Sequence, residues 1–96
     1  MKNQIVLTAC IAEVQSLRYT PAGLPALDLR LEHESQQKEA GVQRDVKTAI
    51  KAVAFGALAE RLARQALGSS WEFSGFLASP RNGKGVVFHI QDIQQN

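Results

Sequence analysis

The stretch that decides the fold is residues 71–93, WEFSGFLASPRNGKGVVFHIQDI, in which two strand-like runs flank a short basic tip. In residues 71–77 large apolar residues alternate with small or polar ones up to Gly75, and a glycine inside such a run is typical of a bulge or bend. Residues 86–90 are β-branched and aromatic, which is typical of a return strand. An Asn-Gly pair in the tip favours a tight turn, and the tip is also long enough for a wider loop. The stretch therefore predicts a β-hairpin.

The tip of this hairpin carries Arg81 and Lys84 without a nearby acid. Its glycines allow it to follow the shape of whatever it touches. Two interpretations stay open, because exposed basic residues either contact an anionic partner or are simply solvated.

Length and composition predict one small domain. A chain of 96 residues buries about two-thirds of its unfolded surface and leaves little depth for an enclosed active site. Eleven Lys and Arg against nine Asp and Glu give a formal net charge of only +2, so an anionic partner has to be recognised by a local patch or a symmetric doubling of one. The single Cys10 excludes an intramolecular disulfide, and we expect it to be a buried thiol. No stretch resembles a membrane span or a signal peptide, so we expect a cytoplasmic protein without a membrane partner.

The N-terminal residues 5–19 predict a long strand that is partly apolar on both faces. Ile5, Leu7 and Ile11 share one parity, and Val6 and Cys10 share the other. Such a strand needs cover on both sides, and a second copy of the chain is the simplest candidate for the outer one. The pattern therefore predicts a homodimer.

Further elements follow in a clear order. Residues 20–25 contain two prolines and a glycine and predict a turn, and residues 26–35 alternate as a half-buried strand. Residues 36–41 read as a polar loop, and residues 42–55 as a third long strand. The apolar pattern of that strand changes face over residues 52–55, which indicates a bulge or a strand bending around a barrel.

A helix is predicted over residues 57–67, because this segment is rich in strong helix formers and Gly68 follows it. The resulting order is three strands, one helix and two strands. Five strands with one helix between strands 3 and 4 is the layout of the OB fold, a mainly β barrel that forms a single domain here. Ligands of that barrel lie across its second and third strands and two of its loops.

A nucleic-acid groove is the site that this layout predicts. Its walls would be the turn around residues 18–25 and the hairpin tip, and the basic residues of the third strand would form its floor. Tyr19 is the best candidate for stacking on a base, with ordinary packing as the alternative reading. Phe73, Phe76 and Phe88 are expected in the core, and Trp71 in the core or at its rim. The candidate nucleic-acid-binding residues are Arg18, Tyr19, Arg44, Lys47, Lys51, Arg81 and Lys84.

An enzyme is not predicted. His33 and His89 lie within strand patterns and lack metal-ligand spacing, and no nucleophile elbow or phosphate-binding glycine motif is present. We therefore expect neither catalysis nor a cofactor or metal. The acidic residues between 32 and 39 form either a solvated edge or a surface for protein docking.

The run LEHESQQKEAG at residues 31–41, followed by Arg44, resembles PriB, the bacterial family of primosomal replication proteins N. The similarity extends over most of the chain, including the turn at residues 21–25, Gly68 and the hairpin residues 75–76. The resemblance implies a homodimer of single-strand-binding barrels. It also implies three partners in the replication-restart primosome: single-stranded DNA, the helicase PriA and the protein DnaT.

The family's DNA-contacting positions in the first turn and the hairpin tip match Arg18, Arg81 and Lys84 here. The chain departs from the family at Lys47, where an aromatic residue is usual, and at Glu34, where a basic residue is usual. We therefore hold two hypotheses. The first is an accessory protein that bridges single-stranded DNA and the restart helicase, and the second is a protein-interaction module on an OB scaffold with little DNA affinity.

Overall fold

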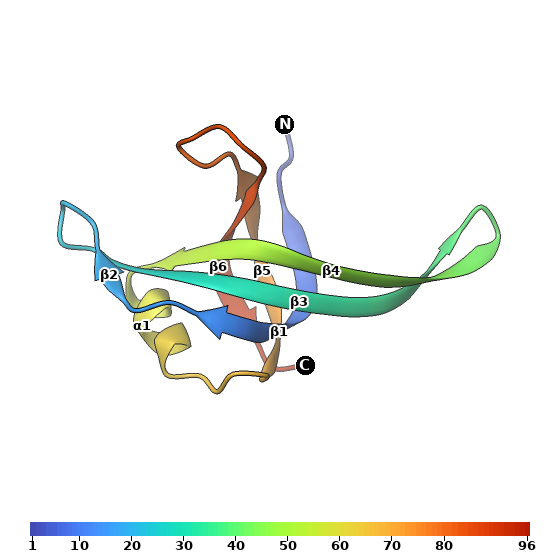
Figure 1. The fold of residues 1–96 in the computed structure, drawn as a ribbon, viewed down its shortest axis with the longest axis horizontal. Coiled ribbons are helices and arrows are strands. Elements are labelled where there is room, and N and C mark those ends of the chain that lie inside the picture. The colour runs from blue at the N-terminus through green and yellow to red at the C-terminus, as the bar shows by residue number, and fades with distance from the viewer.

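The computed structural model describes all of residues 1–96 and contains a closed β-barrel with one helix (Figure 1). The chain forms β1 (Ile5–Val14), β2 (Arg18–Tyr19), β3 (Pro25–Glu39), β4 (Val42–Phe55), α1 (Ala57–Ala63), β5 (Ser70–Ala78) and β6 (Val87–Gln94). Neighbouring strands follow the order β1-β5-β6-β4-β3, and a β1–β3 pairing closes the ring. Only β4 and β6 pair in parallel. The predicted mainly β, five-stranded OB barrel is confirmed, since β2 is a two-residue extension on β3 and the helix separates the third and fourth long strands.

The core fills the barrel interior with the inward-pointing residues of each strand. Ala59 and Leu62 of α1 join this cluster, so the helix closes one end of the barrel. No polar or charged residue is buried. Each large apolar side chain buried in this way stabilises the fold by about 1.5–3 kcal/mol. The largest fully buried side chains are those of Phe73, Phe88, Ile11, Leu27, Leu31 and Leu62.

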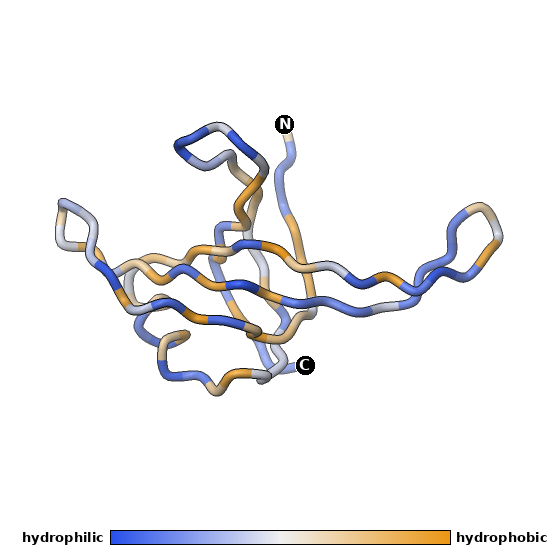
Figure 2. The backbone as a smooth tube through the Cα atoms, viewed as in Figure 1, coloured by the Kyte–Doolittle hydropathy of each residue, from blue (hydrophilic) through white to orange (hydrophobic).

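The hairpin of β3 and β4 extends well beyond the barrel (Figure 1). Glu39 pairs with Val42, so Ala40 and Gly41 alone form the turn, with φ of 51° and 78°. Positive φ at both positions is the geometry of a type I′ turn. The loop predicted for residues 36–41 is therefore wrong, because residues 36–39 continue β3. The alternation of a half-buried strand is missing there because hydrophilic residues dominate this arm, which is exposed on both faces (Figure 2).

Helix α1 is shorter than predicted, ending at Ala63 instead of residue 67. The residues after the helix form backbone hydrogen bonds to β1. Gly68 N donates to Ile11 O at 2.7 Å, and Ile11 N donates to Ser69 O at 3.0 Å. These two bonds fix the entry into β5 and leave no room for a further helical turn. The predicted helix is thus correct in position and wrong in length.

The predicted strand over residues 5–19 is divided into β1 and β2, with a register shift between Ile11 and Glu13 in the pairing of β1 with β3. Ala9 and Ile11 point into the core as expected. Cys10 is exposed, so the expectation of a buried thiol is wrong. The reason is that the outer face of β1 has no cover within this chain.

The hairpin of residues 71–93 is confirmed as β5 and β6, and the register shift between Ser74 and Gly75 confirms the predicted bend. A Cβ at position 75 would lie 1.8 Å from the backbone oxygen of His89, so only glycine fits. In the tip, Gly83 N donates to Pro80 O at 2.9 Å, and the positive φ falls on Gly83 rather than Asn82. The longer loop is therefore the correct alternative.

The pattern change over residues 52–55 marks barrel closure and not a bulge. The pairing of β3 with β4 runs without a register shift from Ala26–Phe55 to Glu39–Val42. At Ala52 and Val53, β4 also pairs with β6. Residues 52–54 of β4 are buried on both faces, with Ala52 and Ala54 in the core cluster and Val53 on the outer face.

Candidate nucleic-acid interface

The outer face of β3 and β4 carries two of the predicted cations, Lys47 and Lys51. Residues paired directly across an antiparallel ladder point to the same face. The outward pairs are, in order, Asp28–Val53, Arg30–Lys51, Glu32–Ala49 and Glu34–Lys47. Lys47 and Lys51 therefore share this face. Arg44 does not, because it pairs with Gln37 on the opposite face, and the predicted common floor of Arg44, Lys47 and Lys51 is wrong in this respect.

Several cations of this region are already paired with carboxylates. Arg18 donates from Nε to Asp28 Oδ2 at 2.7 Å and from Nη2 to Asp28 Oδ1 at 3.2 Å. Lys47 Nζ lies 3.2 Å from Glu34 Oε1, and Arg44 pairs with Glu39. These pairs are exposed, and exposed pairs contribute about 1 kcal/mol or less. They nevertheless compete with any phosphate for the same cations.

Arg30 is held by two acids of the outer face, since its Nη2 lies 3.0 Å from Glu13 Oε1 and its Nη1 lies 3.5 Å from Glu32 Oε2. Hydrogen bonding and charge from Glu13 raise the pKa of Arg30 above its ordinary value. Asp28 raises the pKa of Arg18 in the same two ways. Both guanidinium groups therefore already contact carboxylates in the free protein.

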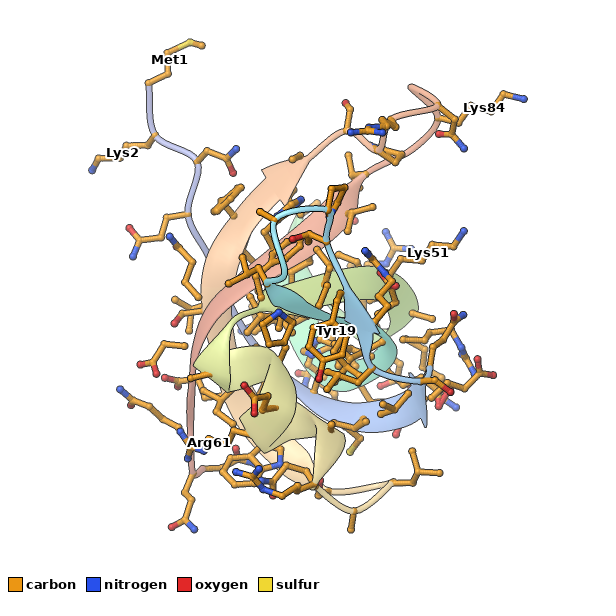
Figure 3. All side chains as sticks on the ribbon, turned by 90° about the vertical axis from the view of Figure 1, so that its left-hand side faces the viewer. Met1, Lys2, Tyr19, Lys51, Arg61 and Lys84 are labelled. Atoms are coloured by element: carbon orange, nitrogen blue, oxygen red, sulfur yellow. The ribbon has the colours of Figure 1, made fainter.

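The remaining predicted cations, Lys51, Arg81 and Lys84, make no ion pair in this chain. Arg81 and Lys84 lie in the exposed loop between β5 and β6, where Asn82 Oδ1 accepts a 3.0 Å hydrogen bond from Lys84 N and folds the tip back on itself. The side chains of Lys51 and Lys84 project toward the same side of the molecule (Figure 3). This unpaired positive charge is the part of the site that is free to meet an anion.

An aromatic column lies on the outer surface where β4, β6 and β5 meet. The rings of Phe76 and His89 stack with centroids 4.8 Å apart and an interplanar angle of 14°, and those of His89 and Phe55 with 6.0 Å and 28°. His89 also pairs with Val53, which shares the outer face with Lys51. Phe55 ends the column and is 39% exposed.

Sequence reasoning missed this column. Phe76 was expected in the core, but it is only half-buried and points outward with His89. The signal was the parity of β5, because Phe76 is three residues from the buried Phe73 and alternation places the two rings on opposite faces. The three rings come from three strands, so local alternation alone could not bring them together.

Tyr19 lies in β2 at the edge of β3, where it pairs with Pro25. Its side chain is 64% exposed, and it belongs to no aromatic pair. The turn beside it is fixed by Thr20 N donating to Leu24 O at 2.9 Å and by Gly23 N donating to Thr20 O at 2.8 Å. Its ring is accessible, and its role in stacking stays a prediction.

A hollow of about 780 Å³ opens where β1 and β3 diverge. β1 pairs with β5 along residues 5–10 but with β3 only from Cys10 onward, so one edge of residues 5–9 has no neighbouring strand. His33 spans part of the gap, with Nδ1 2.7 Å from Thr8 O and Nε2 2.7 Å from Ser35 Oγ. The lining residues are Thr8, Ala9, Cys10, Glu32, His33, Glu34, Lys47, Thr48, Ala49 and Ser70.

Neither a metal-binding cluster nor a membrane-spanning helix is found in the structure. No group of three or more His, Cys, Asp or Glu side chains could hold a metal ion. The seven residues of α1 are far fewer than the roughly 20 that cross a bilayer, and no helix of the chain could span one.

Comparison with known proteins shows which family and which relatives this chain is similar to. Residues 3–92 match the model of a family described as "another single-strand binding protein family". The chain is 45% identical to replication restart protein PriB of Bordetella pertussis over 97% of this chain and 88% of that protein. It is 38% identical to replication restart protein PriB of Nitrosomonas europaea over 97% and 87%.

A solved structure shows the same architecture. The PriB protein of Ralstonia solanacearum superposes with a TM-score of 0.90 at 37% identity, covering 99% of this chain and 98% of that one.

Proposed function

This chain belongs to the PriB family of replication restart proteins, and we propose that it binds single-stranded DNA as an accessory protein of replication restart. The observation that carries this proposal is the unpaired charge of Lys51, Arg81 and Lys84 on a barrel whose outer surface also bears an aromatic column. Proteins that bind single strands without sequence preference combine these two features, because cations follow the phosphates and aromatic faces stack on bases.

The proposed binding mode follows from the positions of these groups. Phosphates would contact Lys51 and the exposed tip between β5 and β6, while a base would stack on the exposed end of the column at Phe55 or on Tyr19. Base stacking on an aromatic side chain contributes about 1–3 kcal/mol. With few such surfaces, we expect modest affinity that falls as salt rises. The chain performs no catalysis in this proposal.

The ion pairs of Arg18 and Lys47 limit how much these two cations can contribute to DNA affinity. A phosphate that reaches either cation has to replace a carboxylate that is already in contact at 2.7 Å or 3.2 Å. These two cations therefore add less to affinity than the unpaired ones. Arg44 is also paired, with Glu39, and we place it at the margin of the site.

We further propose a homodimer formed along β1. Its free strand edge, its exposed Val6 and Cys10, and the hollow beside it all lie on the side that the chain leaves uncovered. Pairing with a second β1 would satisfy the edge, as unpaired strand edges favour association. The exposed Cys10 reports on this: its reaction with a thiol reagent should slow as protein concentration rises into the dimer range. A rate independent of concentration, with a monomer mass in sedimentation, would contradict the homodimer.

We also propose that this chain contacts the helicase PriA and the protein DnaT in the primosome. Such contacts would let it bridge DNA and the helicase. This proposal is supported by the similarity of this chain to replication restart proteins. A role on the bacterial chromosome would also make the protein cytoplasmic. Co-sedimentation of this chain with purified PriA or DnaT tests each partner directly, and the absence of both complexes would leave DNA binding as its whole function.

The competing function is a protein-interaction module with little DNA affinity. The observation that favours it is the number of carboxylates that already hold cations near the predicted groove. Asp28 and Glu34 pair with the predicted cations Arg18 and Lys47, and Glu13 and Glu32 both pair with Arg30. This module would bind partner proteins and show no affinity for an oligonucleotide even at low salt.

A matched pair of variants separates the two functions. Replacing Lys51 and Lys84 by Gln removes two unpaired charges, and we expect it to weaken binding of a fluorescent oligothymidine about tenfold at low salt. Replacing Arg61 and Arg64 by Gln also removes two unpaired charges, at the end of α1 and on the other side of the molecule from Lys51 and Lys84 (Figure 3), and should leave affinity unchanged. Equal loss in both variants would mean that only net charge matters, and no loss in either would refute the proposed site.

A further inference from the structure

A second basic surface lies at the helical end of the barrel, formed by Arg61, Arg64 and Trp71. The guanidinium carbon of Arg61 lies over the ring of Trp71, 5.9 Å from its centroid. Trp71 Nε1 donates to Ser69 Oγ at 3.1 Å, and the half-buried ring packs against the core. The tryptophan is thus fixed on one side by the core and covered on the other by a cation.

The two guanidinium groups of this surface make no ion pair within the chain. Arg61 lies in the last turn of α1 and Arg64 is its C-cap residue in helical conformation, so the two side chains, three residues apart, lie on the same side. Neither makes an ion pair, and the acids nearest to them in sequence, Glu60 and Glu72, make none either. Cations suit the last turn of a helix, but the dipole alone does not require that Arg61 lie against an aromatic ring.

This surface is separate from the proposed DNA site. Arg61 lies at the opposite side of the molecule from Lys51 and Lys84 (Figure 3). A ligand bound here would leave the outer face of β3 and β4 open. The inference therefore does not rest on DNA binding.

We propose that Arg61, Arg64 and Trp71 form a docking surface for an acidic segment of a partner protein. An acidic partner is favoured by charge complementarity, because the two unpaired guanidinium groups present planar donors that match carboxylates. An apolar residue beside the carboxylates would pack on the exposed edge of Trp71. A nucleic-acid base fits less well, because Arg61 covers the ring face on which it would stack.

The single tryptophan gives this proposal a direct readout, since the chain has one indole N–H signal in a ¹H–¹⁵N spectrum. The probe is a short peptide of alternating Asp and Phe, and its control is the same peptide with Asn in place of Asp. The Asp peptide should shift the Trp71 indole signal, and the Asn peptide should not.

Variants assign the contact to the arginines. The double variant Arg61→Gln, Arg64→Gln should bind the Asp peptide at least about tenfold more weakly, while Lys51→Gln, Lys84→Gln should bind it normally. If loss of the Arg61 contact prevents folding, Arg64→Gln alone should still weaken binding.

Three outcomes would overturn the proposal. They are equal shifts from both peptides, no shift at all, or a shift of the indole signal by oligothymidine instead of the Asp peptide. The last outcome would assign this surface to nucleic acid. Loss of oligothymidine binding in the Lys51 and Lys84 variant tests the DNA site separately, so the two proposals can fail independently.

Discussion

Freeing Arg18 from Asp28 should strengthen DNA binding. The Arg18–Asp28 pair is bidentate, with distances of 2.7 Å and 3.2 Å, and its side chains are 51% and 38% exposed. An exposed pair of this kind is worth at most about 1 kcal/mol, which corresponds to about fivefold in an equilibrium constant. Asp28→Asn removes the competing charge, so we expect oligothymidine affinity to rise by up to about fivefold at low salt.

The salt dependence of DNA binding by the same variant gives a second quantity to compare with the prediction. One additional phosphate contact should steepen the slope of log K against log salt by about 0.7 for a single strand. Fluorescence anisotropy over a salt series measures both quantities. Asp92→Asn is the matched control, because it changes the net charge equally at an acid that holds no cation.

A double variant tests the physical reason for the gain. In Arg18→Gln, Asp28→Asn the gain should disappear, since no cation remains to be freed. If Asp28→Asn and Asp92→Asn raise affinity equally, or if the gain persists without Arg18, the reasoning about competition between carboxylate and phosphate is refuted.

Three further predictions concern stability, measured by urea unfolding. Ala40→Asn should stabilise the chain by about 0.5–1 kcal/mol, because Ala40 has a φ of 51° in a turn that favours Asn-Gly; lower stability would contradict the type I′ turn. Gly75→Ala should cost about 3 kcal/mol or more, because its Cβ would lie 1.8 Å from the backbone oxygen of His89, whereas a cost near zero would show that the bend is misplaced. Asn3→Ala should lower the free energy of unfolding by about 1 kcal/mol, because the Asn3 side chain donates to Leu77 O at 2.7 Å and accepts from Leu77 N at 3.0 Å. An unchanged stability would mean that these two hydrogen bonds are not formed in solution.

The strands were predictable from sequence where their patterns are local. Residues 42–55 were predicted as a strand with the same bounds as β4, and Gly75 was recognised as a bend. The end of α1 was not predictable, because the residues after it are held by hydrogen bonds to Ile11, far away in the sequence: Gly68 N donates to Ile11 O, and Ser69 O accepts from Ile11 N. Local helix propensity alone predicts a helix that continues up to Gly68.

The candidate site was predictable only in part. Its residue types could be found from strand order, but which cations are free depends on register. The pairing of Glu34 with Lys47 across β3 and β4, and the bond of Arg18 to Asp28, follow from tertiary placement. The exposure of Cys10 was also missed, although its parity, opposite to Ala9 and Ile11, was the signal for it.

The proposal that this chain binds single-stranded DNA is tested most directly by the anisotropy of labelled oligothymidine titrated with the unaltered protein across a salt series. A duplex of equal length serves as the reference. With three unpaired cations meeting phosphates, we predict binding that prefers the single strand and a slope of log K against log salt of about −2 for each protomer. Absence of binding at low salt, or equal affinity for the duplex, would contradict a single-strand site and favour the protein-interaction module.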